Sequence, residues 1–256
     1  MFEDRGGLIL STEIIIYIAA VYVLAGTVKG VIGFGMPVVS LAMLAPVIGL
    51  KEAIIVFLVP SLVTNIWQGL TGGRLLELTR RLWSLLGLAC VAIWFSTEVL
   101  VSFDGEALTV VLGVILIFYA GFALATPRVP SPGRHEVWMS PVIGILSGVS
   151  VGLTGTFVMP GTVYLQALGL GKDGLVQALG LSFVVTTLAL AASLGGRQNL
   201  SLDLLVLSAG AMVPAMLGMA LGKKCRDRLP EALFRKIFFV ALIIVGVWIV
   251  AKALFL

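Results

Sequence analysis

Two long apolar stretches, each interrupted by a glycine-rich segment that ends in proline, constrain this chain more than any other feature. The first interruption is Gly26-Thr-Val-Lys-Gly-Val-Ile-Gly-Phe-Gly-Met-Pro37; the second, 122 residues later, is Gly148-Val-Ser-Val-Gly-Leu-Thr-Gly-Thr-Phe-Val-Met-Pro160. In lipid such residues leave backbone groups unpaired, which is tolerated only where protein or a water-filled cavity surrounds them. Paired interruptions in the two halves of one chain point to a transport site.

The composition places the whole chain in a membrane. Charged residues make up 12% and hydrophobic residues 59% of the sequence, whereas a soluble domain has about 25% charged residues. The net charge is +4, but the basic residues lie mostly in short loops between apolar runs. There they report orientation, so we expect no nucleic-acid partner. One histidine and two cysteines cannot form a His/Cys metal cluster, and we expect no metal and no cofactor.

Apolar runs of bilayer-spanning length divide the chain into two halves. A broken stretch at 14–49 is followed by three spans, near 53–71, 82–101 and 107–125. A second broken stretch at 139–170 is followed by three more, near 174–194, 203–222 and 233–254. We therefore predict a first membrane repeat at 1–125, a cytoplasmic linker at 126–138 and a second membrane repeat at 139–256.

The halves repeat in their breakers and charges as well as in their apolar residues. The glycines at 26, 30 and 33 recur at 148, 152 and 155, and the prolines at 37 and 160 correspond. Equivalent loops have opposite charge bias: the loop with Arg74, Arg80 and Arg81 is basic, and its counterpart near Arg197 is nearly neutral. Because Lys and Arg accumulate on the cytoplasmic side, we predict inverted repeats.

Inversion requires each repeat to cross the membrane an odd number of times, with each broken stretch running out and back. We thus predict an all-α polytopic membrane protein with eight nominal spans and up to ten helical segments. In this layout 74–81, 126–138 and 223–236 are cytoplasmic and both termini are outside. A count of eight spans with parallel halves is the alternative.

Each break is expected to start a new helix, near Gly35–Pro37 and near Val158–Pro160, because proline suits the first turn of a helix. A helix N-terminus offers free N–H groups and a positive dipole end to an anion. Inverted repeats would bring the two starts together near the midplane. The alternative is that the glycines only allow close helix packing.

Lys29 lies inside an apolar run, where a cation is expensive and points to function. We expect it to attract an anion; the alternative is that it reaches the interface by snorkelling. A second polar set, Ser61, Thr64, Asn65 and Gln68, has the spacing of one helical face. That face either lines a cavity or forms hydrogen bonds between helices. Beside the second break, Thr154 and Thr156 are well placed to contact a substrate.

The segment from Ala25 to Pro37, with its weaker copy at Gly148–Pro160, resembles the sulfite exporter TauE/SafE family. The resemblance covers nearly the whole chain, although the second copy has Thr156-Phe157 where a further glycine is common. It implies an inner-membrane, multi-pass permease for sulfite, sulfonates or other sulfur-containing anions.

The expected function is a secondary transporter that exports a small sulfonate, sulfite or related anion by alternating access. Protons as coupling ion and assembly into a homo-oligomer are further partners that this function allows. The alternatives are transport of another small anion, such as a carboxylate or thiosulfate, and a non-transport role in a membrane assembly. We expect no enzyme, since the only histidine, His135, is in the linker. The candidate substrate-binding residues are Lys29, Gly33, Phe34, Gly35, Pro37, Asn65, Gln68, Thr154, Gly155, Thr156 and Pro160.

Overall fold

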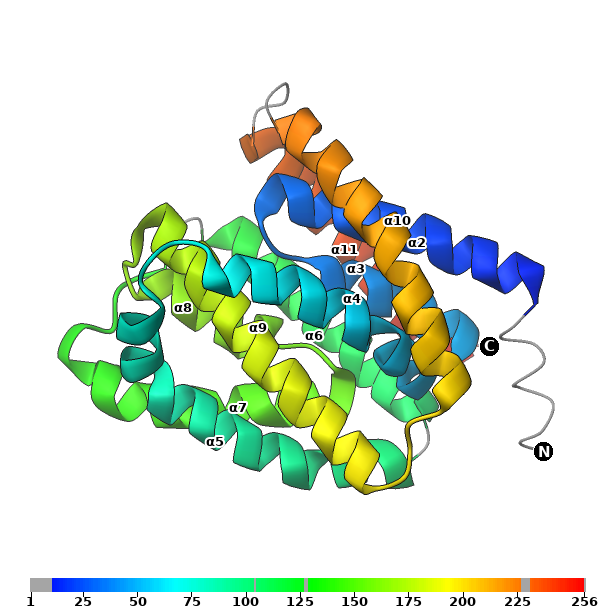
Figure 1. The fold of residues 1–256 in the computed structure, drawn as a ribbon, viewed down its shortest axis with the longest axis horizontal. Helices are drawn as coiled ribbons and strands as arrows, with labels where there is room; N and C mark the ends of the chain where they lie inside the picture. The colour runs from blue at the N-terminus through cyan, green and yellow to red at the C-terminus, as the bar shows by residue number, and fades with distance from the viewer. Residues whose placement is uncertain (1–10, 104, 127–128, 227–230, 256) are drawn as a thin grey trace.

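Helices account for all the regular structure in the computed structural model, which describes residues 11–103, 105–126, 129–226 and 231–255 (Figure 1). The first half contains α2 (Thr12–Ile32), α3 (Met36–Ile48), α4 (Leu50–Leu70), α5 (Leu75–Ser102) and α6 (Gly105–Ala125). The second half contains η1 (Gly133–His135), α7 (Glu136–Thr154), η2 (Val158–Thr162), α8 (Val163–Ala167), α9 (Gly171–Gly196), α10 (Leu202–Arg226) and α11 (Glu231–Phe255).

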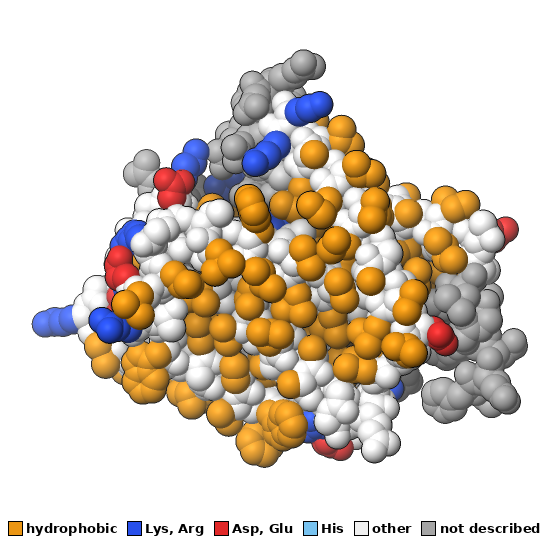
Figure 2. Space-filling view, in the orientation of Figure 1, with side chains coloured by type: hydrophobic (Ala, Val, Ile, Leu, Met, Phe, Trp, Pro, Cys, Tyr) orange, Lys and Arg blue, Asp and Glu red, His pale blue; other side chains and the backbone are white. Residues whose placement is uncertain are grey.

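Eight of the described helices are long and apolar enough to cross a membrane; α3 and α8 are the two α-helices that are not. The predicted all-α polytopic class, with eight nominal spans and ten helical segments, is therefore confirmed. Figure 2 shows apolar side chains across the middle of one face of the molecule, with Lys, Arg, Asp and Glu at its margins. α7 begins at Glu136, inside the region predicted as linker.

Long helices from opposite halves pack side by side. α2 packs along α10 and α5 along α7, while α4 packs on α9 and α6 on α11. In the predicted repeat α2 corresponds to α7 and α5 to α10, so the first two pairs would be equivalent. In the other two pairs each helix contacts its own counterpart.

The helices that contact their own counterparts run in opposite directions. Ser61 of α4 hydrogen-bonds Thr187 of α9, and Gly69, two turns further along α4, lies against Gly180. The sequence number therefore rises along α4 as it falls along α9. Gly113 of α6 and Gly246 of α11 are likewise in contact, within another antiparallel pair.

The spaced glycines that precede each break serve helix packing. A Cβ at Gly26 or Gly30 would collide with the backbone of α10, at Ala215 and Met219. A Cβ at Gly148 would collide with the backbone of α5 at Ala89. Small residues allow backbones to approach closely in membrane proteins, so the packing interpretation holds for these glycines, whereas those at the breaks themselves turn the chain.

A proline in the middle of α4 is compensated by the second half of the chain. Pro60 has no N–H to donate to the carbonyl of Val56. The hydroxyl of Ser208, in α10, donates to that carbonyl at 2.8 Å and accepts from the N–H of Val59 at 3.1 Å. The backbone groups are thus paired inside the protein, as a membrane interior requires.

Candidate functional site

The first break is a tight turn between α2 and α3. Gly33 (φ 90°) ends α2 and Gly35 (φ 102°) precedes α3, both in the left-handed region that favours glycine. Pro37 lies in the first turn of α3, where its missing N–H is not needed. The predicted helix start at Gly35–Pro37 is confirmed. Because α3 has 13 residues, its N-terminus has the free N–H groups and the positive dipole end of a regular helix.

Lys29 lies in the last turn of α2 with its side chain directed into the protein. It is 4% exposed. Its ammonium donates to the Thr64 hydroxyl at 3.0 Å and to the side-chain oxygen of Asn65, both in α4. Snorkelling to the interface does not describe this conformation. Among the described residues no carboxylate pairs with this ammonium, so the neutral partners solvate the charge without balancing it.

The polar contacts continue from Lys29 across α4 to the second half. The Asn65 amide donates to the Ser61 hydroxyl at 3.1 Å, and Ser61 hydrogen-bonds the Thr187 hydroxyl of α9 at 3.2 Å. A further buried hydroxyl on α9, that of Ser182, has no hydrogen-bond partner among the described residues. We call Lys29, Asn65, Ser61 and Thr187 the polar track. It joins α2, α4 and α9 through the interior of the bundle.

Gln68 ties the first break to both halves. Its amide donates to the carbonyl of Gly33 at 2.8 Å and to that of Val176, in α9, at 3.1 Å. The Thr64 hydroxyl lies 4.0 Å from the sulfur of Met36, the first residue of α3. The start of α3 therefore lies beside the residues that contact Lys29. The two remaining candidates at this break, Phe34 and Pro37, are buried.

Hydroxyl groups, and no charge, line the backbone of the second break. Thr154 and Thr156 are fully buried and their hydroxyls are 2.9 Å apart. The Ser150 hydroxyl donates to the carbonyl of Thr156 at 2.9 Å. Gly155 (φ 73°) ends α7 and packs against side chains of α3 and α4. At the position equivalent to Lys29 stands Val151, which is also buried.

The predicted start of a second new helix near Val158–Pro160 is only partly right. Residues Val158–Thr162 form a π-helical turn, in which Met159 has extended backbone (φ −130°, ψ 127°). The α-helix begins at Val163 and has five residues. Pro160 therefore starts no full helix, and a five-residue helix gives little dipole to an anion. Thr156-Phe157, where the sequence departs from the family pattern, immediately precedes this irregular turn.

The described hydrogen bonds keep the two sets of candidates separate. Lys29, Asn65, Gln68 and Gly33 are joined to one another, while Thr154 and Thr156 bond only within the second break. Gly155 lies against Leu41, in the middle of α3 rather than at its start. No hydrogen bond among the described residues joins the two helix starts, so their expected meeting stays a prediction.

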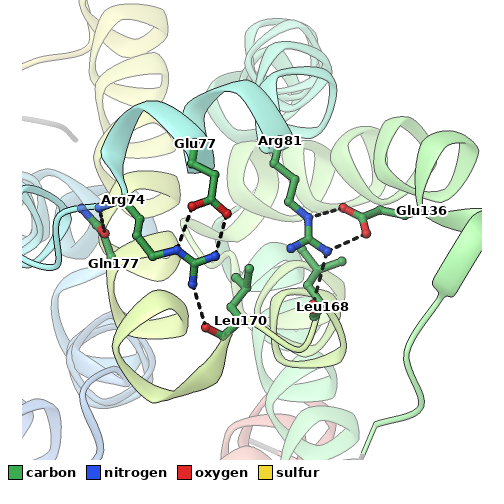
Figure 3. Close-up of polar contacts among 7 residues, drawn as sticks. All are labelled: Arg74, Glu77, Arg81, Glu136, Leu168, Leu170 and Gln177. Carbon is green, nitrogen blue, oxygen red and sulfur yellow. Dashed lines mark hydrogen bonds and ion pairs between the residues drawn. The ribbon is translucent and has the colours of Figure 1, made fainter.

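Two arginines at the start of α5 bind the segment between α8 and α9 (Figure 3). Arg74 forms a bidentate ion pair with Glu77, at 2.6 and 2.9 Å, and donates to the carbonyl of Leu170 at 3.1 Å. The hydrogen bonds that Arg74 donates to Glu77, and the negative charge of Glu77, raise the pKa of Arg74. The backbone N–H of Arg74 also donates to the side chain of Gln177, in α9, at 3.0 Å.

Arg81 repeats this arrangement two turns further along α5. It forms a bidentate pair with Glu136, the first residue of α7, at 2.6 and 2.7 Å, and donates to the carbonyl of Leu168 at 3.2 Å. Arginine suits this role because its planar fork binds carboxylate in two places. We call Arg74, Arg81 and their partners the arginine rim. It joins the two halves on the side predicted to be cytoplasmic.

Some of these residues were not predicted as candidates. Ser61, which the spacing placed on the polar face of α4, and Thr187 of α9 complete the polar track, but neither was a candidate for substrate binding. Gln177, Ser208 and the pairing of Arg81 with Glu136 had no sequence signal beyond residue type.

A bundle of apolar helices with two broken segments, and a buried lysine with no carboxylate partner among the described residues, is the arrangement expected of a polytopic membrane transporter. The family described as Sulfite exporter TauE/SafE matches residues 18–249, and the chain belongs to this family. Membership makes it a membrane transporter of the kind that handles sulfite-type anions, which agrees with the expectation of no enzyme. No curated protein and no solved structure matches the chain.

Proposed function

We propose that this protein is a secondary transporter that exports a small sulfur-containing anion, such as a sulfonate or sulfite, by alternating access. The observation that supports this best is the buried ammonium of Lys29, which has hydroxyl and amide partners and no carboxylate among the described residues. A buried charge without a counter-ion is destabilising by several kcal/mol. An anion entering from water supplies the missing charge.

The surroundings of Lys29 favour an oxyanion. The Thr64 hydroxyl can donate to an oxygen once it turns away from the carbonyl of Pro60, to which it now donates at 2.7 Å. The N-terminus of α3 lies beside Thr64 and adds unpaired N–H groups. Hydroxyl, amide and ammonium donors around one centre match the several oxygens of a sulfonate or sulfite. Family membership favours sulfur over carbon at the centre of the anion; acetate and thiosulfate are the competing substrates.

Alternating access would use the two halves as the moving parts. The arginine rim joins them on the predicted cytoplasmic side, and opening on that side would have to release the bonds of Arg74 and Arg81 to the 168–170 segment. The antiparallel contacts of α4 with α9 and of α6 with α11 support inverted repeats, because counterparts in parallel repeats would run in the same direction.

Transport is tested by flux in proteoliposomes, with sulfite, taurine, sulfoacetate, thiosulfate and acetate as the panel and a pH gradient imposed or omitted. We expect flux of a sulfur oxyanion and expect Lys29→Met to reduce it about 100-fold or more, since breaking a buried charge pair costs about 3–5 kcal/mol. Lys51→Met is the matched control, because Lys51 lies at the start of α4, away from the polar track, and should transport normally. Absence of flux for every anion would refute the transporter.

Inversion is tested by labelling single cysteines from one side of the membrane. After Cys90 and Cys225 are replaced by serine, Arg80→Cys and Ser201→Cys place an exposed thiol at equivalent positions of the two halves, in the second turn of α5 and directly before α10. In oriented vesicles an impermeant maleimide should label one variant and leave the other unlabelled until the membrane is permeabilised. Labelling of both from the same side would overturn the inversion while leaving transport untouched.

A further inference from the structure

A groove on the outside of the bundle has features of a binding site that the transport function does not use. It lies between the N-terminal halves of α5 and α7 and has a volume of about 650 Å³. Trp83, Gly87 and Val91 form its α5 wall, and Arg134 and Val137 form part of the opposite wall. The polar track lies elsewhere, between α2, α4 and α9.

The walls of this groove lie where lipid contacts the protein. Trp83, in the third turn of α5, is 72% exposed, and Val137, in the first turn of α7, is 83% exposed, although both are large apolar residues. Tryptophan gathers at the level of lipid headgroups. From Trp83 to Val91 the α5 wall extends by about 12 Å along the helix axis, at the ordinary rise per residue. That length accommodates a substantial part of an acyl chain.

The charge at the mouth of the groove is positive. Arg81 and Glu136 both line it, but their bidentate pair cancels the two charges. Arg134 remains, exposed at the end of the groove that the linker closes, and no carboxylate pairs with it in the part of the chain that the structure describes. A basic pocket between membrane helices on the cytoplasmic side is suited to an anionic headgroup.

We propose that this groove binds an anionic phospholipid, with the headgroup phosphate on Arg134 and an acyl chain against Trp83, Gly87 and Val91. A soluble phosphate has no apolar part that would contact the α5 wall. A zwitterionic lipid would fill that wall but would gain less from Arg134, the one unpaired cation among the described residues that line the groove. A bound lipid would also brace the helices that Arg81 and Glu136 connect.

Native mass spectrometry of the intact protein in detergent, with equal amounts of phosphatidylglycerol and phosphatidylcholine, tests the proposal. The wild-type chain should retain phosphatidylglycerol in preference, and Arg134→Gln should lower that preference about fivefold, as expected for one arginine at a lipid surface. Arg80→Gln is the charge-matched control, because Arg80 is exposed on α5 but does not line the groove. It should keep the preference.

The apolar wall is tested separately by filling it. A Cβ at Gly87 meets no atom within 4 Å, so Gly87→Leu should fold normally while blocking the groove and lowering retention of both lipids. Gly121→Leu, at another open glycine outside the groove, is the size-matched control.

Three outcomes would overturn the lipid site: equal loss of preference in Arg80→Gln and Arg134→Gln, unchanged retention in Gly87→Leu, or equal displacement of the lipid by glycerol 3-phosphate. The first would indicate general surface charge, the second an unused groove, and the third a soluble phosphate. None of them bears on anion flux, so the transporter proposal would stand.

Discussion

The two breaks occupy equivalent places in the two halves, yet they differ in charge, in helix structure and in surroundings. The first has a buried lysine, and a 13-residue helix follows it. The second has Val151 in place of Lys29, a pair of threonine hydroxyls, and a π-helical turn before a five-residue helix. The chain thus retains the backbone break in both halves and places the cation in only one.

This asymmetry limits the charge of the anion that the protein can bind. Lys29 donates to side-chain oxygens on α4. At the second break the threonine hydroxyls hydrogen-bond each other and the nearby backbone. One ammonium balances one negative charge, as on a sulfonate or on hydrogensulfite. The comparison therefore predicts a site for a singly charged group at the first break, with the second break supporting α3 and α4 through Gly155.

The largest effect is expected from giving the second break the charge of the first. Val151→Lys would bury an ammonium where the described neighbours offer no carboxylate, and should lower the free energy of unfolding by about 3 kcal/mol. Unfolding by sodium dodecyl sulfate in mild detergent measures it. Val151→Met, similar in length but uncharged, is the control and should lose less than half as much. If Val151→Lys is as stable as Val151→Met, the two breaks are electrostatically equivalent and the comparison fails.

The next effect distinguishes the two turns by their packing. Gly155 and Gly33 both have positive φ, but a Cβ at Gly155 would lie 2.9 Å from Ile54 and 3.1 Å from Leu41, whereas at Gly33 it would meet only a Val176 methyl at 3.6 Å. Gly155→Ala should therefore destabilise the protein by about 2–3 kcal/mol and Gly33→Ala by about 1 kcal/mol, near the two ends of the range for a strained residue. Thermal unfolding in detergent would show the order; a larger loss at Gly33 would contradict it.

Local chemistry explains why the sequence was enough to predict the first break. Gly33 and Gly35 permit left-handed backbone and Pro37 suits a first helical turn, so three residues within a stretch of five specify the turn. The eight long helices follow from the length needed to cross a bilayer. The second break has one fewer glycine, and Pro160 alone does not decide where the α-helix resumes, so the π-helical turn was not foreseeable.

Contacts between distant segments account for what the sequence did not predict. The polar spacing on α4 identified one helical face, but whether that face meets α2, α9 or water depends on how the helices pack. The sequence therefore predicted a functional role for Lys29 but not which residues it bonds. The pairing of Arg81 with Glu136 likewise requires α5 and α7 to be neighbours. The glycines of α7 allow that close packing, but the sequence does not say which helix they face.

The smallest effects compare polar groups of the two breaks without changing charge. Asn65→Leu keeps the size of the side chain and removes a hydrogen-bond acceptor from Lys29. The ammonium is then held less firmly beside the anion. We expect anion affinity to fall about tenfold, in the range of a hydrogen bond to a charged group. Thr156→Val removes a hydroxyl that bonds only within the second break, and should change affinity less than twofold. Equilibrium binding to the purified protein measures both.

The contrast between these two variants separates a one-sided site from a shared one. If the anion contacted both breaks, the Thr156 hydroxyl would be a ligand, and Thr156→Val would lose affinity as Asn65→Leu does. If it contacts only the first break, Thr156→Val should lose stability alone, by about 1 kcal/mol for a neutral hydrogen bond. Thr64→Val makes the same test at the first break, because the Thr64 hydroxyl bonds both Lys29 and the carbonyl of Pro60. We expect anion affinity and protein stability both to fall in this variant. A fall in stability alone would show that the anion does not bind beside Lys29.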